Sequence, residues 1–396
     1  MPSGGILISQ YSPMPRPTLP TISIRLPRVL VLESTFIFGG VENLLLNIFT
    51  RLPDAAERVT FCSLYEPGPM GPKFQESGCR FEHSLMRCKA DPLGFLRLRR
   101  ILKRDRIEVV YIVLQPLTLF WGYLASRSLG IPVVCLVGNT LNIRAHPKLK
   151  IYRFILPHVA AIVAQAEAQR EHLIENAGFP ERLLHVISNG VDCASFSETT
   201  NRLAMLRSLG IPPDAKIVGI NARMVLLKGI DVFLQAAALL RDSSHDIHFV
   251  LVGTGPDEQG FRDLAAHLKI TSVVHFLGFR EDLRALTSIY DVAVLASRTE
   301  AFPMVLLEYM AAGRAICATD VGSVSEVVSN RNEVLLVPAD SPSAIADAVR
   351  TLLNDHDLSL RLSESARSTV TGRFSISQTV GQTDDLLTTI VTRNRP

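Results

Sequence analysis

Short apolar runs recur along the chain, and amphipathic segments separate them. In the first half the apolar runs predict strands at 28–33, 59–64, 109–114, 132–137, 160–164 and 184–187. The segments between them carry helical periodicity, most clearly at 41–52, 92–106, 117–128 and 167–176. Strands that alternate with helices indicate a parallel sheet covered on both faces.

The same pattern pauses and then starts again in the second half. The pause at 196–215 is polar and contains Pro212-Pro213, which is typical of a linker. After it, apolar runs predict strands at 217–221, 247–252, 273–277, 291–295, 315–318 and 334–337. Helical periodicity predicts helices at 229–241, 257–268, 341–354 and 358–370. The chain therefore reads as two α/β units in tandem, each a doubly wound, Rossmann-like domain.

This reading divides the chain into five parts. Six prolines within 1–27 predict a loose N-terminal extension. The first domain spans 28–195, the linker 196–215 and the second domain 216–372. An amphipathic segment in 373–396 is left over, and we expect it to pack back on the first domain. Ligands of doubly wound sheets bind beyond the carboxyl ends of the strands, so we expect a site between the two domains.

Charge is balanced overall but not along the chain. The 41 Lys+Arg and 38 Asp+Glu give a net charge of +3, too little for a protein devoted to nucleic acid. Residues 1–196 hold 22 basic and 15 acidic residues, whereas the remainder holds 19 and 23. The basic first half favours an anionic partner there, such as a membrane surface, although a chance split remains an alternative.

Cysteine usage and leader signals restrict the class further. The six cysteines form no CxxC pair, which is typical of a reducing compartment, and Cys79, His83 and Cys88 lack a fourth ligand for zinc. The first residues do not resemble a signal peptide. The uncharged stretch 109–126 is shorter than a spanning helix, and Gln115-Pro116 splits it into a strand and a helix. We therefore expect a cytoplasmic protein.

A basic run at 97–106, RLRRILKRDR, lies on the predicted helix 92–106. Such a helix can lie on anionic lipid, at ~1 kcal/mol per Lys or Arg near the surface. The other interpretation is an ordinary solvated helix face. Phe95, Leu96 and Leu98 beside the charges keep a peripheral position on the inner face of the membrane open.

The strongest candidate chemistry lies in EAFPMVLLEYMAAG, residues 300–313. Glu300 follows a predicted strand and Glu308 lies in the first turns of the next helix. Free backbone amides and the positive end of a helix dipole would stand beside a carboxylate there, which suits a phosphate flanked by sugar hydroxyls. The residues alone leave a second interpretation equally open, namely a solvated loop Glu and a Glu that favours the helix dipole.

A second group, NARMVLLKG at 221–229, places Arg223 and Lys228 between a strand and a helix. Two cations at a strand end can neutralise a diphosphate, at roughly 4 kcal/mol per contact before desolvation. Gly39-Gly40 and Gly253-Thr254-Gly255-Pro256 also follow strands, where glycine lets a backbone approach a ligand. Each is a weak signal alone, and ordinary surface charge or plain turns remain alternatives. No GxxxxGK[ST] or HExxH motif occurs, which argues against a P-loop ATPase and a zincin. No GxSxG elbow occurs either, although the sequence leaves a Ser-His-Asp triad open.

Taken together, these motifs resemble the retaining glycosyltransferases of family 4. EAFPMVLLEYMAAG with Asp320-Val321-Gly322 and Glu326-Val327-Val328 is similar to that family's Glu–seven residues–Glu segment and the "atdvGg..Evv" that follows it. Val186–Asp192 resembles "VIpNGvD", NARMVLLKG resembles "GRl...KG", and Gly253–Pro256 resembles "GxGP". The agreement covers about 160–380, and the first domain is similar mainly through Gly39-Gly40-Val41-Glu42.

The resemblance implies a GT-B fold, with an acceptor on the first domain and a nucleotide-diphosphate sugar on the second. By position, Arg223 and Lys228 would hold the donor diphosphate, Glu308 the nucleotide ribose and Glu300 the hydroxyls of the transferred sugar. Donor contacts are further implied for Gly39, Gly40, Gly253 and the amides at Phe302, Met304 and Val305. No resident cofactor and no metal are implied. The expected reaction is sugar transfer with retention, onto a saccharide or lipid-linked acceptor in envelope polysaccharide or glycolipid synthesis.

The sequence departs from the family at the acceptor side. The family's "tvHg" segment reads Leu136-Val137-Gly138-Asn139-Thr140 here, without the histidine, and Asn139 is the candidate for a sugar contact in its place. Gln165-Ala166 and Ala301 also replace the usual Ser and Gly. Two alternatives therefore stay open: a catalytically weak or silent GT-B protein that binds a nucleotide-sugar, and a nucleotide-sugar epimerase, which the Glu300–Glu308 segment disfavours.

Overall fold

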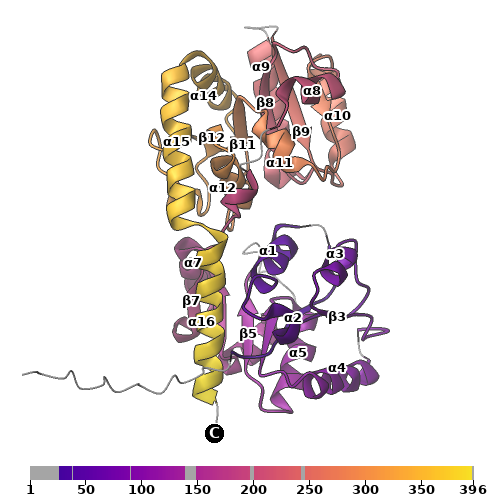
Figure 1. The fold of residues 1–396 in the computed structure, drawn as a ribbon. Coiled ribbons are helices and arrows are strands. Elements are labelled where there is room, and N and C mark those ends of the chain that lie inside the picture. Colours follow the sequence, from indigo (N-terminus) through magenta and orange to yellow (C-terminus); the bar gives the residue numbers. More distant parts are fainter. Residues whose placement is uncertain are drawn as a thin grey trace, which may run out of the picture.

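The chain folds into two α/β lobes that lie one above the other (Figure 1). The structure is a computed structural model, and it describes residues 26–37, 39–89, 91–138, 149–196, 200–241 and 246–394. Asn139 lies outside the described residues, as do most of the predicted N-terminal extension and part of the predicted linker. Each lobe has one parallel sheet with helices on both faces, as the alternating pattern predicts.

The first lobe contains a seven-stranded sheet in the order β3-β2-β1-β4-β5-β6-β7, with every pair parallel. Its strands are β1 (Val29–Glu33), β2 (Val59–Ser63), β3 (Arg80–Glu82), β4 (Val109–Val113), β5 (Val133–Leu136), β6 (Ala161–Ala164) and β7 (Leu184–Val186). Its α-helices are α1 (Gly40–Phe49), α2 (Ala55–Arg58), α3 (Gly71–Glu76), α4 (Pro92–Arg104), α5 (Pro116–Arg127), α6 (Leu149–Ile155) and α7 (Glu167–Ala177). Short 3-10 turns are η1 (Leu156–His158), η2 (Glu181–Leu183) and η3 (Cys193–Phe196).

The second lobe contains a six-stranded parallel sheet in the order β10-β9-β8-β11-β12-β13. Its strands are β8 (Lys216–Asn221), β9 (Ile247–Val252), β10 (Val274–Phe276), β11 (Val292–Leu295), β12 (Ala315–Thr319) and β13 (Leu335–Val337). The helices are α8 (Arg202–Ser208), α9 (Ile230–Arg241), α10 (Glu258–His267), α11 (Leu283–Ser288), α12 (Met304–Ala311), α13 (Val324–Val327), α14 (Pro342–Asn354), α15 (His356–Arg373) and α16 (Ile376–Asn394), with the 3-10 turn η4 (Leu226–Lys228).

The central strands are buried on both faces, which explains why they read as continuous apolar runs. In each lobe, side chains alternate between two apolar clusters, one on either face of the sheet. On β1, for example, Val29 and Val31 pack on one side, and Leu30 and Leu32 on the other. Two buried layers per sheet account for most of the apolar residues in the sequence.

The segment predicted as a linker is not a plain linker, because it contains the helix α8. Asn201 caps this helix through its side chain, which accepts a hydrogen bond from the amide of Ala204 at 3.0 Å. Leu206 of α8, together with Ile211 and Ala215, is buried in the core of the second lobe. The polar pattern of 196–215 concealed this helix, since a single fully buried side chain, Leu206, anchors it.

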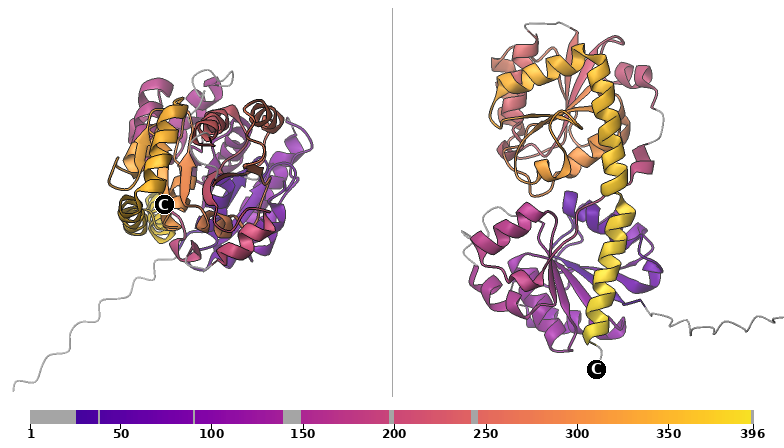
Figure 2. Two further views of the ribbon diagram at one scale, coloured as in Figure 1. Left: turned by 90° about the horizontal axis from the view of Figure 1, so that it is seen from above. Right: turned by 90° about the vertical axis from the view of Figure 1, so that its left-hand side faces the viewer.

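The last helix returns to the first lobe. Figures 1 and 2 show α15 and α16 running along one side of the molecule, with α15 on the second lobe and α16 on the first. Val191 pairs with Ser375 in a parallel bridge, and Arg58 of the first lobe makes an ion pair with Asp384 of α16 at 2.7 Å. Leu387 and Ile390 of α16 are buried in the first lobe's core. These contacts join the lobes through the C-terminal segment.

The carboxyl ends of the two sheets face each other. A Cβ placed on Gly40, at the start of α1, would lie 3.9 Å from the Met304 side chain at the start of α12. Farther along this boundary, the carboxylate of Glu326 accepts hydrogen bonds from the first amides of α7, those of Glu167 at 2.8 Å and Ala168 at 2.6 Å. A carboxylate at a helix N-terminus is favourable, so Glu326 links the lobes while it caps a helix.

The uncharged stretch 109–126 forms β4 and most of α5, as the split at Gln115-Pro116 predicts. Among the described residues, no helix is long and apolar enough to cross a membrane. The described residues also hold no group of three or more His, Cys, Asp or Glu side chains placed to bind a metal. The stretch 109–126 is thus a strand followed by a helix and not one continuous helix.

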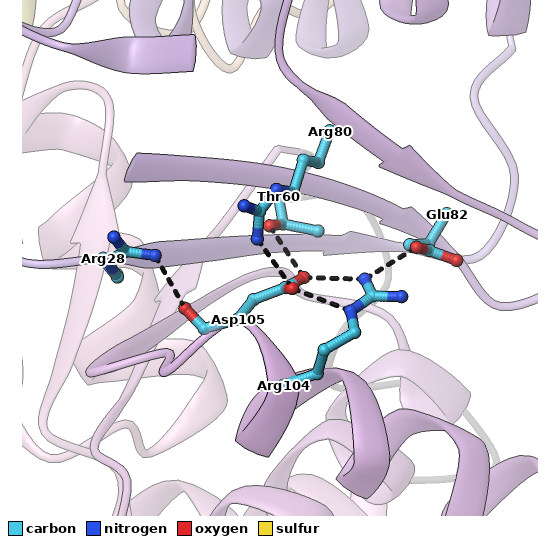
Figure 3. Close-up of polar contacts among 6 residues, drawn as sticks. All are labelled: Arg28, Thr60, Arg80, Glu82, Arg104 and Asp105. Atoms are coloured by element: carbon cyan, nitrogen blue, oxygen red, sulfur yellow. Dashed lines mark hydrogen bonds and ion pairs between the residues drawn. The ribbon is translucent and has the colours of Figure 1, made fainter. Parts of the chain in front are cut away.

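An ion-pair cluster fastens the C-terminal end of α4 to the sheet (Figure 3). Asp105, which is 2% exposed, accepts hydrogen bonds from Arg80 at 2.7 Å and from Arg104 at 2.8 and 2.9 Å. Arg104 also reaches Glu82 at 2.7 Å. Burial acts to raise the pKa of Asp105, but the hydrogen bond and charge of Arg104 and the charge of Arg80 outweigh it, and the pKa is lowered. Arg104, one of the cations of the basic run 97–106, is therefore engaged in ion pairs within the protein.

Candidate active site

The centre of the candidate site is an ion pair between two loops of the second lobe. Lys228 ends the turn η4 after β8, and its Nζ lies 2.6 Å from Oε1 of Glu300, which follows β11. The hydroxyl of Ser297 donates to the same oxygen at 2.6 Å. The Glu300 side chain is 8% exposed and that of Lys228 is 29% exposed. The structure thus brings together two of the predicted catalytic residues, which lie 72 positions apart.

Arg298 fixes the two loops relative to each other. Its guanidinium donates to both carboxylate oxygens of Asp231 in α9, at 2.9 and 2.7 Å, and to Asp340 at 2.7 Å. It also donates to the carbonyl of Leu226, and its own amide donates to the carbonyl of Leu227 at 2.9 Å. A planar guanidinium that makes this many bonds holds the η4 turn, and so Lys228, beside the loop that carries Glu300.

Two glycines make that close approach possible. Gly229 has a φ of +63° and a Cβ there would collide with the carbonyl oxygen of Ala296. Gly322 has a φ of +55° and a Cβ there would collide with the carbonyl oxygen of Glu300. Both positions therefore need glycine for backbone conformation as well as for space. Neither glycine could be identified as part of the site from its sequence motif alone, because the collisions involve carbonyls far away in the chain or in another loop.

Gly253 performs the same task at the neighbouring strand end. Its φ is +133°, and a Cβ would collide with the carbonyl oxygen of Ala222, next to Arg223. Its amide donates to the carbonyl of Gly278 at 2.8 Å. Gly253 thus lets the loops after β8, β9 and β10 pack together at the carboxyl edge of the sheet, where it was predicted to line a donor site.

Arg223 lies on the boundary between the lobes, not against the two acidic residues of the 300–313 segment. Its side chain is exposed, and the structure describes no hydrogen bond or ion pair between Arg223 and Glu300 or Glu308. Its charge acts on Glu42 of α1: burial raises the pKa of that carboxyl, and Arg223 opposes the increase. Arg223 therefore lies near enough to the first lobe for its charge to act on Glu42, which follows the Gly39-Gly40 turn.

Glu308 lies in α12, eight positions after Glu300. Burial raises its pKa to about 7, and the positive charge of Arg284 on α11 opposes that shift. The guanidinium of Arg284 in turn lies 5.7 Å from the ring centroid of Phe196, in a cation–π arrangement. A carboxyl with a pKa near neutrality changes its charge over the ordinary working range of a protein.

The start of α12 offers fewer free amides than the sequence predicts. The amide of Met304 already donates to the carbonyl of Phe302 at 3.0 Å. The amides of Phe302 and Val305 have no hydrogen-bond partner in the described part of the chain, and no side chain caps the helix. Two of the three predicted amides thus remain available to an anion, beside the positive end of α12.

Family models match both lobes. The model described as "Glycosyltransferase Family 4" matches residues 38–195, and the model described as "Glycosyl transferases group 1" matches residues 201–369. The first match ends at residue 195, just before the predicted linker 196–215, and the second begins at residue 201, within that linker. Lys228, Glu300 and Glu308 all lie within the second match.

Curated relatives match a large part of the chain at moderate identity. The Alpha-D-kanosaminyltransferase of Streptomyces kanamyceticus is 28% identical over 272 residues, which cover 65% of this chain and 70% of the relative. The D-inositol 3-phosphate glycosyltransferase of Corynebacterium urealyticum is 31% identical over 249 residues, or 60% of this chain and 58% of the relative. The chain thus spans little more than half of the latter protein.

Solved structures share the whole arrangement of the two lobes. Alr3699/HepE of Anabaena, crystallised in complex with UDP, gives a TM-score of 0.81 at 20% identity and covers 91% of this chain and 100% of that chain. A glycosyltransferase from Rickettsia africae gives a TM-score of 0.78 at 20% identity, over 92% of this chain and 98% of that chain. At this level of identity the likeness shows the fold, which is GT-B.

Proposed function

Because this chain belongs to the glycosyltransferases that the group 1 and family 4 models describe, we propose that it transfers a sugar from a nucleotide-diphosphate donor to a hydroxyl of a saccharide or lipid-linked acceptor. The single observation that carries the proposal is the ion pair of Lys228 and Glu300, 2.6 Å apart at the carboxyl edge of the second sheet. A cation that can bind phosphate thus lies beside a carboxylate that can accept hydrogen bonds from sugar hydroxyls.

The charges suit the departure of a nucleoside diphosphate. Breaking the bond between the anomeric carbon and the phosphate oxygen leaves negative charge on the diphosphate and positive charge on the sugar. Lys228, Arg223 and the free amides at the start of α12 would stabilise the diphosphate, and no residue of the chain need bind a metal for this step. Glu300 would then exchange part of its bond with Lys228 for hydroxyls of the sugar.

Retention of configuration is the stereochemical outcome that we propose. Glu300 pairs with Lys228 and its Oε1 accepts from Lys228 and Ser297, so we assign it to hold the sugar and not to attack the anomeric carbon. The acceptor oxygen would attack from the face that the diphosphate leaves. Its proton would pass to the departing phosphate oxygen, so one C–O bond breaks, one forms, and no covalent intermediate is needed.

The donor base stays to be identified, and UDP is a reasonable first probe because the Anabaena relative in fold was crystallised with it. Thermal unfolding with UDP-, GDP-, ADP- and dTDP-sugars tests the proposal, since a ligand at 100 times its Kd stabilises the fold by about 2.7 kcal/mol. We expect one class of nucleotide-sugar to raise the Tm and to be turned over. Binding without transfer or hydrolysis would favour the silent GT-B protein instead, and conversion of the sugar itself would favour an epimerase.

The outer surface of the first lobe supports a position on an anionic membrane. Leu93 and Leu96 of α4 are 55% and 50% exposed, and Phe120 and Leu124 of the neighbouring α5 are also exposed. In a helix, residues 93, 96, 100 and 103 share one face, so Arg100 and Lys103 continue the stripe that the two leucines begin. Exposed apolar side chains followed by exposed cations are the composition of a helix that lies in a lipid interface. An acceptor on a lipid carrier would meet the enzyme there.

A further inference from the structure

A buried carboxyl at the carboxyl edge of the first sheet is not explained by the donor site. Glu33 is the last residue of β1 and has no exposed surface. Its Oε1 accepts hydrogen bonds from the Ser34 amide at 2.9 Å and from the Gln115 amide nitrogen at 2.7 Å. Its Oε2 is buried and has no partner in the described part of the chain. A buried polar atom without a partner is costly, so native proteins usually supply one.

Polar side chains of the loop after β1 and of the residue before α5 pack against Glu33, and we call this group the polar wall. The Ser34 hydroxyl lies 3.1 Å from Glu33 Oε1 and 2.7 Å from Gln115 Oε1. Ser34 and Gln115 are half-exposed, although Glu33 is not. The Ser34 carbonyl accepts from the Tyr65 amide at 3.0 Å and the Ser63 hydroxyl at 3.0 Å, which fixes the loop after β1 to the end of β2. A hydroxyl that reaches Glu33 Oε2 would therefore pass two polar side chains that are already in place.

This wall lies on the side of the first lobe that faces the donor site. The negative charge of Glu42 of α1 acts on Glu33, and the charge of Arg223 of the second lobe acts on Glu42. Glu33 ends β1 and Gln115 follows β4, and the carboxyl ends of these two strands point to the other lobe. A group held at Glu33 would thus be on the acceptor's side of the reacting sugar.

The chemistry of the wall selects a neutral partner. Burial, and to a smaller degree the negative charge of Glu42, raises the pKa of Glu33 to about 8, although the bonds from Ser34 oppose this. At neutral pH the group is therefore mainly a carboxylic acid, whose O–H donates a hydrogen bond. An ammonium group has no oxygen to accept that bond, whereas a sugar or polyol hydroxyl can accept it and donate to Gln115 Oε1 in return.

We propose that Glu33, Ser34 and Gln115 form an acceptor subsite that binds a hydroxyl of a neutral saccharide or polyol, with Glu33 as the buried donor. The inference rests on the proposed function, because it identifies this edge of the first sheet as the acceptor's position. Glu33 is a binding residue here; the proton of the reacting hydroxyl does not pass to it.

Binding of two neutral probes, methyl α-D-glucopyranoside and myo-inositol, tests the subsite. Each is titrated by NMR into protein that is saturated with UDP, between pH 6.5 and 9.5. We expect the wild type to bind at least one probe, with an affinity that falls about tenfold as the pH rises through 8. Glu33→Gln, which keeps the shape and a donor, should bind at pH 7 within threefold of the wild type and show no decrease above pH 8.

Two further variants complete the design. Glu33→Leu removes the donor and should lose at least tenfold in probe affinity at pH 7, while Glu108→Gln, the same substitution just before β4 at the opposite edge of the sheet, should behave as the wild type. Because Glu33→Leu leaves the Ser34 and Gln115 donors unpaired and can fail to fold, the isosteric Glu33→Gln carries the pH test independently.

The outcomes separate the subsite from the proposed function. Binding of neither probe, equal binding by Glu33→Leu, or an unchanged decrease above pH 8 in Glu33→Gln would each overturn the subsite. If nucleotide-sugars fail to stabilise the wild type, the proposed function fails instead. Nucleotide-sugar stabilisation that Glu33→Leu leaves intact, together with lost probe binding, is the result that supports both.

Discussion

The ammonium of Lys228 and the carboxylate of Glu300 lie 2.6 Å apart, although 72 positions separate them in the sequence. The two side chains form an ion pair, and the Ser297 hydroxyl donates a hydrogen bond to the same carboxylate oxygen of Glu300. The pair is only partly exposed to solvent, so its charges are less screened than those of a surface ion pair. The site therefore holds its cation in a fixed position before any phosphate arrives.

Replacing Lys228 should impair turnover more than folding. In Lys228→Met we expect kcat for sugar transfer or donor hydrolysis to fall about 10²–10³-fold, the usual loss when one stabilising donor of a developing anion is removed. Stability should fall by about 1–3 kcal/mol, because Glu300 keeps a largely buried charge without its cation. Steady-state kinetics with the donor found by thermal unfolding, and urea denaturation, measure the two effects.

The control for this variant is Lys216→Met. Lys216 begins β8 and is 54% exposed, and its ion pair with Asp291 is long, at 3.9 Å. Its loss should change stability by less than about 0.5 kcal/mol and leave kcat unchanged. Equal kinetic losses in the two variants would mean that Lys228 has no special part in transfer.

Because the pKa of Glu308 is raised, we expect nucleotide binding to depend on pH. Its pKa of about 7 means that it is mostly protonated at pH 6 and mostly ionised at pH 8. If its carboxylate accepts hydrogen bonds from the ribose hydroxyls, UDP should bind several-fold more tightly at pH 8 than at pH 6. Glu308→Gln should bind UDP more weakly at pH 8 and show a smaller pH dependence.

Calorimetric titration of both proteins with UDP at several pH values measures this effect. The terminal phosphate of UDP also titrates, with a pKa near 6, but it does so equally for both proteins. The ratio of their affinities therefore reports Glu308 alone. A ratio that is constant from pH 6 to pH 8 would place Glu308 outside the nucleotide site.

The Asp105 cluster of Figure 3 should contribute to stability and not to activity. Asp105→Asn keeps the shape but removes the charge that Arg80 and Arg104 share. A fully buried pair broken in this way costs 3–5 kcal/mol, and we expect about 2 kcal/mol here because both arginines are half-exposed. Urea denaturation at pH 7 measures this loss.

The sign of the pH effect follows from the lowered pKa of Asp105. A carboxyl whose pKa is lower in the folded state stabilises the fold above its unfolded pKa of about 3.9, and the contribution is lost as the pH falls through the folded pKa. The difference between wild type and Asp105→Asn should therefore shrink below pH 4. Asp347→Asn, whose carboxylate is 74% exposed in its pair with Arg350, is the matched control and should cost at most about 0.5 kcal/mol.

Much of the architecture could be predicted because the sheets are parallel and buried. The central strands are mainly apolar runs, and the predicted bounds agree with β1, β4, β9 and β12 to within one residue at each end. β3 was missed because it is a three-residue edge strand, Arg-Phe-Glu, whose polar residues join the Asp105 cluster. Its stability comes from partners far away in the sequence, which no local pattern reveals.

Like the fold, the candidate site could be predicted from the sequence only in part. Ligands of such sheets bind beyond the carboxyl ends of the strands, so a charged residue in the loop between a strand and the next helix is a site candidate. Lys228 and Glu300 could be identified in this way. Arg298 could not, because its partner Asp231 is 67 positions away and its role is to hold a backbone turn. Glu33 gave no signal at all, since a single acid at the end of an apolar run is indistinguishable from an ordinary strand end.

The exposed stripe on α4 leads to a prediction about lipid binding. Arg97 and Arg104 of the basic run bond within the protein, whereas Arg100 and Lys103 are exposed on the same face as Leu93 and Leu96. We expect the wild type to float with vesicles of 30% anionic lipid at low salt and to dissociate in 0.5 M NaCl, since screening shortens the range of the attraction. The double variant Arg100→Gln/Lys103→Gln should bind about 30-fold more weakly, from ~1 kcal/mol for each charge.

The apolar part of the stripe is tested separately. Leu93→Ser/Leu96→Ser should weaken binding to the same vesicles without changing its salt dependence, because apolar insertion is not screened. Leu360→Ser, at a leucine of α15 that is 49% exposed on the other lobe, is the control and should bind as the wild type. If the wild type does not float with anionic vesicles at low salt, the stripe is a solvated helix face, and an acceptor would have to reach Glu33 and Lys228 from solution.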